Sequence, residues 1–259
     1  MPTTFTLTSD QRAEFEARGV LRLPGFHGLD TVAPMAAAIW ADLTARLGMA
    51  RGRPETWTTP MPAHFQALTG RGVFNALGSP DLRRLANALL GEGAWDEPRL
   101  WGQPLVTLPT PRPVLPRPSW HFDLPGAAYQ PPLPGLRVFT VLEPLGPGGG
   151  GTLVVTGSHR LALDLTRAAG PISSPVLRKT LRAADPWLTA VIDAATDQVG
   201  ALMAAPAVVG GIPLAVEQIT GEPGDLILMH PLMLHGVAHN GSDRVRMMVT
   251  STVWRKALV

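Results

Sequence analysis

The sequence predicts a mainly β protein with helical additions, in the sandwich or jelly-roll class, formed as a single domain over residues 1–259. After residue 100, much of the chain consists of short apolar or alternating runs separated by turns rich in proline and glycine. Many short strands with such turns are typical of sandwiches and jelly rolls. Helix signals occur instead in the N-terminal part and in an insertion at about 160–210.

The first helix and strand have clear boundaries. Thr8 and Gln11 have the spacing of a capping box, so a helix is expected over 12–18. Gly19 is the kind of residue that commonly ends a helix, because it adopts the left-handed conformation without strain. The apolar run 20–23 that follows predicts a short strand.

Two more N-terminal helices are expected. Asp30 is expected to cap a long amphipathic helix that ends at Leu47. Ser79 is the expected cap of a third helix, with Pro80 in its first position and Gly91 at its end. Within the later helical insertion, Asp185 followed by proline marks a further helix start.

The remaining elements are strands and loops. The expected strands are 100–108, 120–123, 137–143, 152–156, 215–219, 225–229 and 246–254. Segments 109–118 and 146–151 are the most prominent loops between them. The first of these could be read as a polyproline ligand, but a rigid loop beside the next strand is the favoured interpretation.

Composition excludes several classes of protein. Hydrophobic residues make up 45% and charged residues 16% of the chain, which suits a packed globule and excludes a disordered one. The absence of cysteine excludes disulfides, thiolate zinc sites, iron–sulfur clusters and cysteine nucleophiles. The formal net charge is only +2, and the arginines are dispersed among acids, so no nucleic-acid partner is expected.

No membrane or targeting segment is expected either. The N-terminus lacks the basic and apolar regions of a signal peptide. The longest apolar stretch, 201–216, is interrupted by prolines and glycines and is shorter than the roughly 20 residues of a spanning helix. A cytoplasmic protein acting on a small-molecule substrate is expected, and nothing in the sequence indicates its oligomeric state.

A candidate metal site begins with the run Trp120-His121-Phe122-Asp123. In a strand, residues two apart project to the same face, so His121 and Asp123 would converge while Phe122 packs behind them. A second histidine would complete a two-histidine, one-carboxylate set, which suits non-haem iron(II) chemistry. His-x-Asp alone is a weak signal, because the dipeptide spacing arises by chance in many chains.

His235, just after the strand 225–229, is the favoured second histidine. His239 lies four residues later, as in a helical zinc pair, but nearby Gly236, Asn240 and Gly241 disfavour a helix. His230 precedes a proline and could be a core residue. The other histidines, His27 and His64 in the helical N-terminal part and His159 in a Gly-Ser-His turn, are expected to be structural.

The metal pair is one of an ordered series of motifs. The others are the entry segment 7–26, the segment 151–160 (GTLVVTGSHR), Gly224-Asp225, His235-Gly236, and Asn240 with Arg246. In this order and spacing, the chain resembles the phytanoyl-CoA dioxygenase family of iron(II)/2-oxoglutarate oxygenases over nearly its whole length. The resemblance implies a double-stranded β-helix, or cupin-like jelly-roll, core flanked by N-terminal and inserted helices. It also implies that His121, Asp123 and His235 are the catalytic metal ligands, with Fe(II), the cosubstrate 2-oxoglutarate and O₂.

The resemblance also implies a binding site for the cosubstrate. 2-Oxoglutarate would chelate iron at one end, and a guanidinium can bind the carboxylate at its other end with two charge-assisted hydrogen bonds. Arg246 is the favoured residue and Arg244 its rival on the same face, although Arg244 better suits a surface turn. Gln103 and Thr140 are further candidate contacts. Relatives commonly have serine two residues after the distal histidine, where this chain has Val237, so that one contact is in doubt.

The implied activity is hydroxylation of an unactivated C–H bond of a small organic metabolite, with succinate and CO₂ as co-products. Asp123 favours hydroxylation over halogenation, while desaturation or ring formation would use the same triad. The insertion 160–210 and the loop 109–118 could form the rim of the substrate pocket. Two alternatives stay open: a cupin-like metalloenzyme that does not use 2-oxoglutarate, and a non-catalytic binding protein on the same scaffold.

Overall fold

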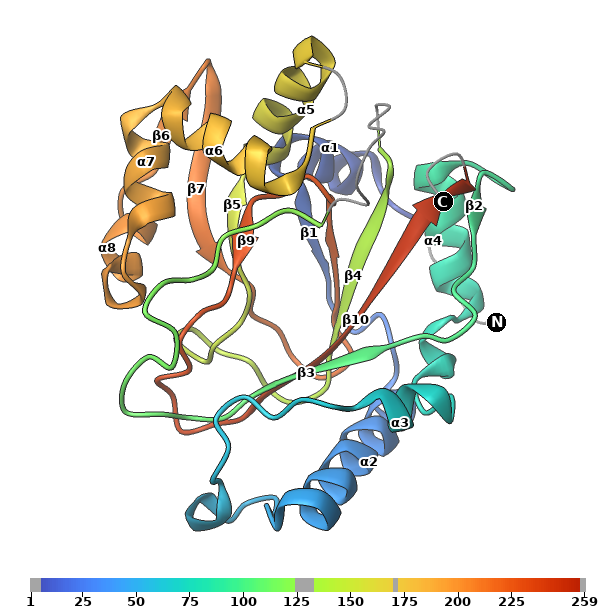
Figure 1. Cartoon of the computed structure of the whole chain (residues 1–259). Helices are drawn as coiled ribbons and strands as arrows, with labels where there is room; N and C mark the ends of the chain where they lie inside the picture. Colours follow the sequence, from blue (N-terminus) through green and yellow to red (C-terminus); the bar gives the residue numbers. More distant parts are fainter. Residues whose placement is uncertain (1–5, 124–132, 170–171, 257–259) are drawn as a thin grey trace.

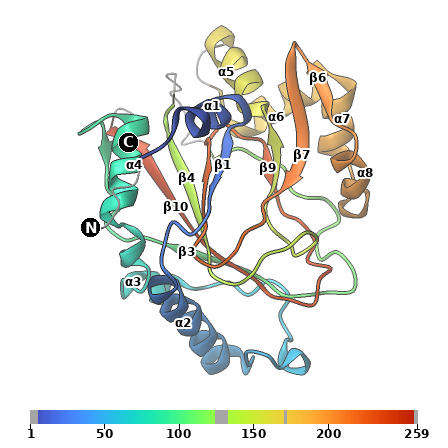
Figure 2. The same cartoon turned by 180° about the vertical axis from the view of Figure 1, so that it is seen from behind.

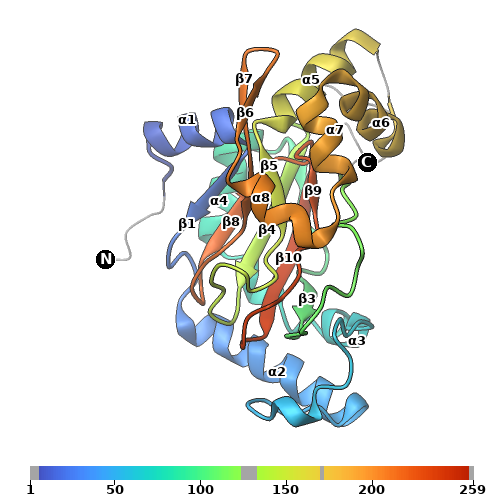
Figure 3. The same cartoon turned by 90° about the vertical axis from the view of Figure 1, so that its left-hand side faces the viewer.

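The fold is two antiparallel sheets that face each other, as Figure 1 and the side view in Figure 3 show. The computed structural model describes residues 6–123, 133–169 and 172–256. The larger sheet has the order β1 (Val20–Leu23), β8 (Leu226–Met229), β4 (Gly135–Val141), β10 (Arg246–Arg255) and β2 (Trp95–Asp96), with β3 (Gln103–Thr107) also paired to β10. The smaller has the order β6 (Ala207–Val209), β7 (Ile212–Gln218), β5 (Leu153–Thr156) and β9 (His235–Gly236). The predicted fold class is confirmed.

Helices cover the outer sides of this pair of sheets. The N-terminal helices are α1 (Ser9–Arg18), α2 (Leu29–Leu47), η1 (Pro54–Thr56), α3 (Gln66–Gly70), η2 (Asn75–Leu77) and α4 (Pro80–Leu90). The inserted helices are α5 (Ser158–Ala169), α6 (Ser174–Ala184), α7 (Pro186–Asp193), η3 (Thr196–Gln198) and α8 (Val199–Met203). The inserted helices α6, α7 and α8 gather beside the smaller sheet, and α1 lies across the end of β1 (Figure 2). The helical insertion therefore occupies the expected place.

The helix boundaries follow the expected caps. Thr8 and Gln11 form the full capping box of α1, and Gly19 ends that helix with φ 74°. The side chains of Ser79 and Asp185 accept hydrogen bonds from the first turns of α4 and α7. The predicted cap Asp30 is wrong by two residues, because Gly28 is the N-cap of α2. Asp30 lies inside the first turn, where its negative charge interacts favourably with the positive end of the helix.

The core is divided by the larger sheet into an outer and an inner part. On β4, Leu136 and Val138 pack outward into the cluster that includes α2 and α4. The alternate residues Phe139 and Val141 face inward, toward Val154 of β5. A third cluster fills the space between the smaller sheet and the inserted helices. The inner faces of β4 and β10 therefore point into the space between the sheets, where a site can form.

The expected strand at 120–123 is not formed in the structure. His121 makes only an isolated antiparallel bridge, with His235. Ser119, directly before, has a left-handed φ of 55°, which turns the chain out of an extended course. Helix α6 supplies the neighbouring backbone groups with partners: Arg178 donates to the carbonyl of Trp120, and the amide of Phe122 donates to Ser174. Side chains of the insertion thus take the place of a strand partner.

Across the described ranges, no helix is long and apolar enough to cross a membrane.

Two buried histidines give the fold a pH-dependent stability. His27 and His159 are both buried, and burial is the main cause that lowers the pKa of each from 6.5 to about 4. The unfolded chain therefore binds protons that the folded protein does not, and stability is lost as the pH falls from about 6.5 toward 4. At pH 5 we expect each histidine to lower the free energy of unfolding by roughly 2 kcal/mol relative to pH 7.5.

Urea unfolding of the wild type and of His159→Gln at pH 7.5 and pH 5 measures this effect. The variant is expected to lose about half of the pH dependence attributed to the two histidines, because glutamine does not titrate. An unchanged difference between the two pH values in the variant would show that His159 is not a source of it.

Candidate metal centre

The two histidines of the predicted triad are joined through their own backbones. The amide of His121 donates to the carbonyl of His235 at 2.8 Å, and the amide of His235 donates back at 3.0 Å. Their rings lie with centroids 4.1 Å apart. On its other side, His235 of β9 pairs with Val154 of β5. The smaller sheet therefore fixes both imidazoles at its edge.

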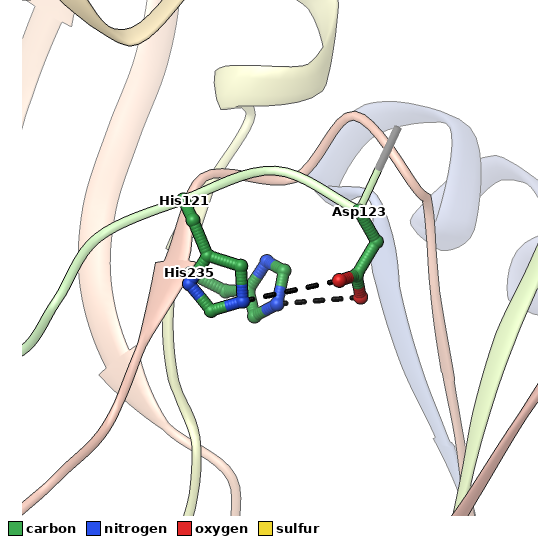
Figure 4. A group of neighbouring side chains, drawn as sticks. All are labelled: His121, Asp123 and His235. Atoms are coloured by element: carbon green, nitrogen blue, oxygen red, sulfur yellow. Dashed lines mark ion pairs between the residues drawn. The ribbon is translucent and has the colours of Figure 1, made fainter. Parts of the chain in front are cut away.

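Asp123 completes the group, and Figure 4 shows the three side chains converging. Its Oδ1 lies 3.8 Å from Nε2 of His121, and its Oδ2 lies 3.4 Å from Nε2 of His235. The potential ligand atoms of the three residues are all within 4.8 Å of one another. No second group of three potential ligands occurs among the described residues. The structure therefore brings together the three residues that the sequence singled out.

The backbone sets the tautomer of both histidines. Nδ1 of His121 lies 2.9 Å from the carbonyl oxygen of Ser119, and Nδ1 of His235 lies 2.9 Å from that of Met233. A carbonyl oxygen can only accept, so each Nδ1 carries the proton and each neutral ring presents the lone pair of Nε2 to the site. Two lone pairs and a carboxylate that face one another repel unless a cation lies between them. This is the arrangement of a metal site, in which ligating histidines donate their other N–H to a fixed acceptor.

The charge states also suit a metal. Burial opposes ionisation of Asp123, but its electrostatic interactions with His235, Arg137 and His121 outweigh burial and lower the pKa of Asp123 to about 2. Burial, followed by the charge of His235, lowers the pKa of His121. At neutral pH, Asp123 is therefore a carboxylate and His121 is neutral, which are the forms that bind divalent metals.

Arg246 is a buried cation without an acidic partner. Its Nη2 donates to Oγ1 of Thr152 at 2.9 Å, and its Nη1 is 3.5 Å from Oγ1 of Thr107. Within the part of the chain that the structure describes, its Nε has no hydrogen-bond partner and no carboxylate forms an ion pair with it. Burial lowers the pKa of Arg246 only to about 10, so the group stays charged at neutral pH.

Arg246 also lies at a definite separation from the triad. Thr152, which accepts its hydrogen bond, precedes Val154 by two residues, and Val154 is paired with His235. Two residues along an extended chain span about 7 Å. A dicarboxylate of five carbons, about 5 Å between its end carbons, fits between the triad and this guanidinium. Thr152 was not recognised in the sequence, because its proximity to Arg246 depends on the pairing of distant segments.

The other candidate contacts fall in different places. Gln103 lines a cavity of about 630 Å³ together with Arg246 and Val237. Residues 61–70 form another part of its wall, including His64, a role that the sequence did not indicate. Arg244 is exposed, in the turn before β10.

Thr140 is not brought to this site. It alternates with the inward-facing Phe139 and Val141, so it lies on the outer face of β4 with Val138 and faces the helices. The expectation that Thr140 contacts the cosubstrate does not agree with this register.

The remaining histidines lie outside the triad. The rings of His159 and His230 contact each other with centroids 4.9 Å apart, and Nε2 of His159 bonds the carbonyl of Glu16. His239 is 3.4 Å from the hydroxyl of Thr110. These contacts are structural, as expected for His159.

Known proteins with similar folds were found by structure but not by sequence. No protein-family model matches the chain, and no curated protein matches it in sequence. One similar solved structure is the non-haem α-ketoglutarate (2-oxoglutarate)-dependent carbocyclase SnoK from nogalamycin biosynthesis, with TM-score 0.59, 17% identity, and coverage of 96% of this chain and 84% of that one. The epimerase SnoN, in complex with Fe³⁺, α-ketoglutarate and nogalamycin RO, has TM-score 0.57, 14% identity, and coverage of 95% and 82%.

EctD from S. alaskensis, with 2-oxoglutarate and 5-hydroxyectoine, has TM-score 0.57, 17% identity, and coverage of 97% and 77%. The folds of these structures agree over nearly the whole of this chain. At such low identity the similarity establishes the fold alone, and the predicted jelly-roll architecture is thereby confirmed.

Proposed function

We propose that this protein is an iron(II)- and 2-oxoglutarate-dependent dioxygenase that hydroxylates an unactivated C–H bond of a small organic molecule, with succinate and CO₂ as co-products. The observation that carries the proposal is the buried guanidinium of Arg246, which has no acidic partner among the described residues. It bonds Thr152, which precedes by two residues the β5 partner of His235 in the His–Asp–His group. Either feature alone has structural explanations. Together they require a metal and a small dianion in one site.

The buried arginine points to an anionic ligand. An unpaired buried charge costs several kcal/mol, so a fold retains one only where a ligand or a structural partner compensates it. No described acidic side chain does so. A carboxylate that accepts from the guanidinium would do so, and 2-oxoglutarate offers one at the end remote from its chelating keto acid.

The triad suits iron. Two histidines and one carboxylate with open positions are typical of non-haem iron(II) oxygenases, whereas structural zinc sites are closed by four protein ligands. Iron with 2-oxoglutarate and O₂ would supply the oxidising chemistry when bound. The residues of the chain bind and orient: His121, Asp123 and His235 hold the metal, and Arg246 with Thr152 holds the far carboxylate.

Two further residues complete the proposed cosubstrate site. Gln103 lies on the wall of the cavity that Arg246 and Val237 also line, which supports a contact with 2-oxoglutarate. Val237 lines this cavity and has no hydroxyl, unlike the serine that relatives commonly have at this position. The hydroxyls near Arg246 are instead those of Thr152 and Thr107. We infer that these hydroxyls orient the guanidinium.

Hydroxylation is the simplest outcome that this site supports, because Asp123 occupies the position of the acidic ligand. The structural neighbours SnoK and SnoN are described as a carbocyclase and an epimerase, so the same fold also supports other oxidative outcomes.

An anaerobic titration of metal-free protein with iron(II) and then 2-oxoglutarate tests the proposal. We expect a weak visible charge-transfer band from the chelate in the wild type. Asp123→Ala is expected to weaken iron binding by more than the roughly 100-fold loss that follows removal of an outer-sphere partner. Asp164→Ala, which removes an exposed carboxylate of α5, is the matched control and should titrate as the wild type does.

Two results would contradict the proposal in different ways. Iron bound with no chelate band would indicate a cupin-like metalloenzyme that does not use 2-oxoglutarate. Iron affinity equal in wild type and Asp123→Ala would indicate that the triad is not a metal site and would favour a binding protein.

A further inference from the structure

A second arginine reaches the metal centre from the opposite sheet. Arg137 lies on the inner face of β4, and its Nη1 donates to Oγ1 of Thr252 on β10 at 2.7 Å. Its guanidinium carbon is 5.8 Å from the centroid of the Phe139 ring. Its Nε is 3.3 Å from Oδ2 of Asp123. Arg137 was not recognised as a site residue in the sequence, because an arginine at the start of a strand resembles a solvated strand end.

The contact with Asp123 does not use the guanidinium fully. Although the two atoms are close, neither Nε of Arg137 nor Oδ2 of Asp123 has a hydrogen-bond partner among the described residues, and both atoms are buried. Thr252 and Phe139 hold the group from the side of the sheet. Nη2 makes no hydrogen bond within the described residues. Nη2 is therefore the nitrogen of this guanidinium that can still donate to a ligand.

Arg137 lies on the more exposed side of the centre. The side chains of His121 and Arg137 are 45% and 22% exposed, whereas that of His235 is 5% exposed. Arg246 is buried at the other end of the inner face of β10, six residues from Thr252 and so about 20 Å away along the strand. The two arginines thus lie on opposite sides of the triad, with the deeper one on the side proposed for the cosubstrate.

On the basis of the proposed function, the charges of the loaded site leave room for one further anion. The positive charges are those of iron(II), Arg246 and Arg137, and the negative charges are those of 2-oxoglutarate and Asp123. Their sum leaves one positive charge in excess. Asp123 is the one acidic side chain that acts electrostatically on Arg137 among the described residues, and segment 124–132 contains no aspartate or glutamate. A metal bound to the triad would share the negative charge of Asp123. That carboxylate would then offset less of the positive charge of Arg137 in the loaded site.

We propose that Arg137 binds a carboxylate of the substrate, and that the substrate class is therefore organic acids with one negative charge near the oxidised carbon. A single carboxylate balances the excess charge and can accept a charge-assisted hydrogen bond from Nη2, whereas a phosphate dianion would overcompensate the charge. The same arginine holds the substrate beside the metal from the face opposite to Arg246. Arg137 is a substrate-binding residue in this assignment.

Matched pairs of probes test this assignment. Protein loaded with iron(II) and saturating 2-oxoglutarate, kept anaerobic, is titrated by calorimetry with acetate, butanoate and 4-phenylbutanoate, and with the corresponding amides. In the wild type at least one acid is expected to bind about tenfold more tightly than its amide, the effect of one charge-assisted pair. The preference should disappear in Arg137→Met, whose side chain still covers Phe139, and persist in part in Arg137→Lys.

The control is Arg99→Met, which removes an exposed arginine from the loop before β3 and should retain the preference. The visible chelate band of each variant provides the second readout. A band that is intact in Arg137→Met while the acid preference is lost supports the assignment. A band or an iron affinity lost in Arg137→Met would instead show that Arg137 acts by positioning Asp123, and would overturn it.

Two other results are distinguishable from these. If none of the acids binds more tightly than its amide in the wild type, or none of the probes binds, the carboxylate assignment is wrong while the proposed function stands. If the wild type forms no chelate band, the proposed function itself fails.

Discussion

Replacing Arg246 with methionine is expected to reduce the affinity for 2-oxoglutarate by at least about 100-fold, because loss of one partner of a buried charge pair costs about 3–5 kcal/mol. The same change should make the ligand-free protein more stable. Methionine retains the apolar stem of arginine and removes a buried charge that no described acid compensates. We expect a gain of about 1–3 kcal/mol in the free energy of unfolding.

Arg244→Met is the matched control, since it removes an arginine from the exposed turn two residues earlier. It should change neither quantity. Calorimetry of 2-oxoglutarate binding to the iron-loaded protein and urea unfolding of the ligand-free protein measure the two effects. Unchanged 2-oxoglutarate affinity in Arg246→Met would exclude Arg246 as the clamp, and a less stable variant would show that its hydroxyl partners already compensate the charge.

Gly236→Ala is expected to damage the metal centre by steric overlap alone. A methyl group at this position would lie 2.6 Å from the carbonyl oxygen of Pro118, which also accepts a hydrogen bond from the amide of Val237. Because the obstacle is backbone, the segment leading to His121 must move away from β9. We expect a loss of about 1–3 kcal/mol in stability. Iron affinity should fall about 10- to 100-fold, as when the support of a ligand is removed.

Gly146→Ala provides the comparison, since a methyl group there would meet no atom within 4 Å. Iron titration and urea unfolding of both variants separate a local effect from a general effect of alanine. Equal iron affinity in the two variants would show that the 118–121 segment adjusts without moving His121.

The fold was predictable where local signals decide it. Caps such as Thr8 and Ser79 determine helix ends through their own neighbouring amides. Helix α4 begins as expected, and α1 begins directly after its cap Thr8, three residues before the expected start at Arg12. Asp30 misled because aspartate is favoured both as a cap and within the first turn, and the two positions differ by only two residues. Strand cores agreed better than strand ends, since pairing with distant strands sets where β3 and β4 stop.

The site was predictable only in part, for the same reason. The His–Asp pair and His235 form a local motif and a family-like spacing, and the structure brings them together. The sequence does not indicate on which face of the sheet Thr140 lies. Because β4 is buried on both sides, its residues do not alternate between apolar and polar. Arg137 depends on Thr252, a partner far away in the sequence that only the register of β4 and β10 brings near.

The reciprocal backbone pairing of His121 and His235 has a consequence for how the protein matures. The two residues come from distant parts of the chain, and each holds the other in place. The three side chains therefore converge only after β9 has paired with the segment that carries His121, and a chain made only as far as Asp123 lacks the third ligand. Once bound, a metal would act as a cross-link between the two segments and would shift the folding equilibrium by mass action.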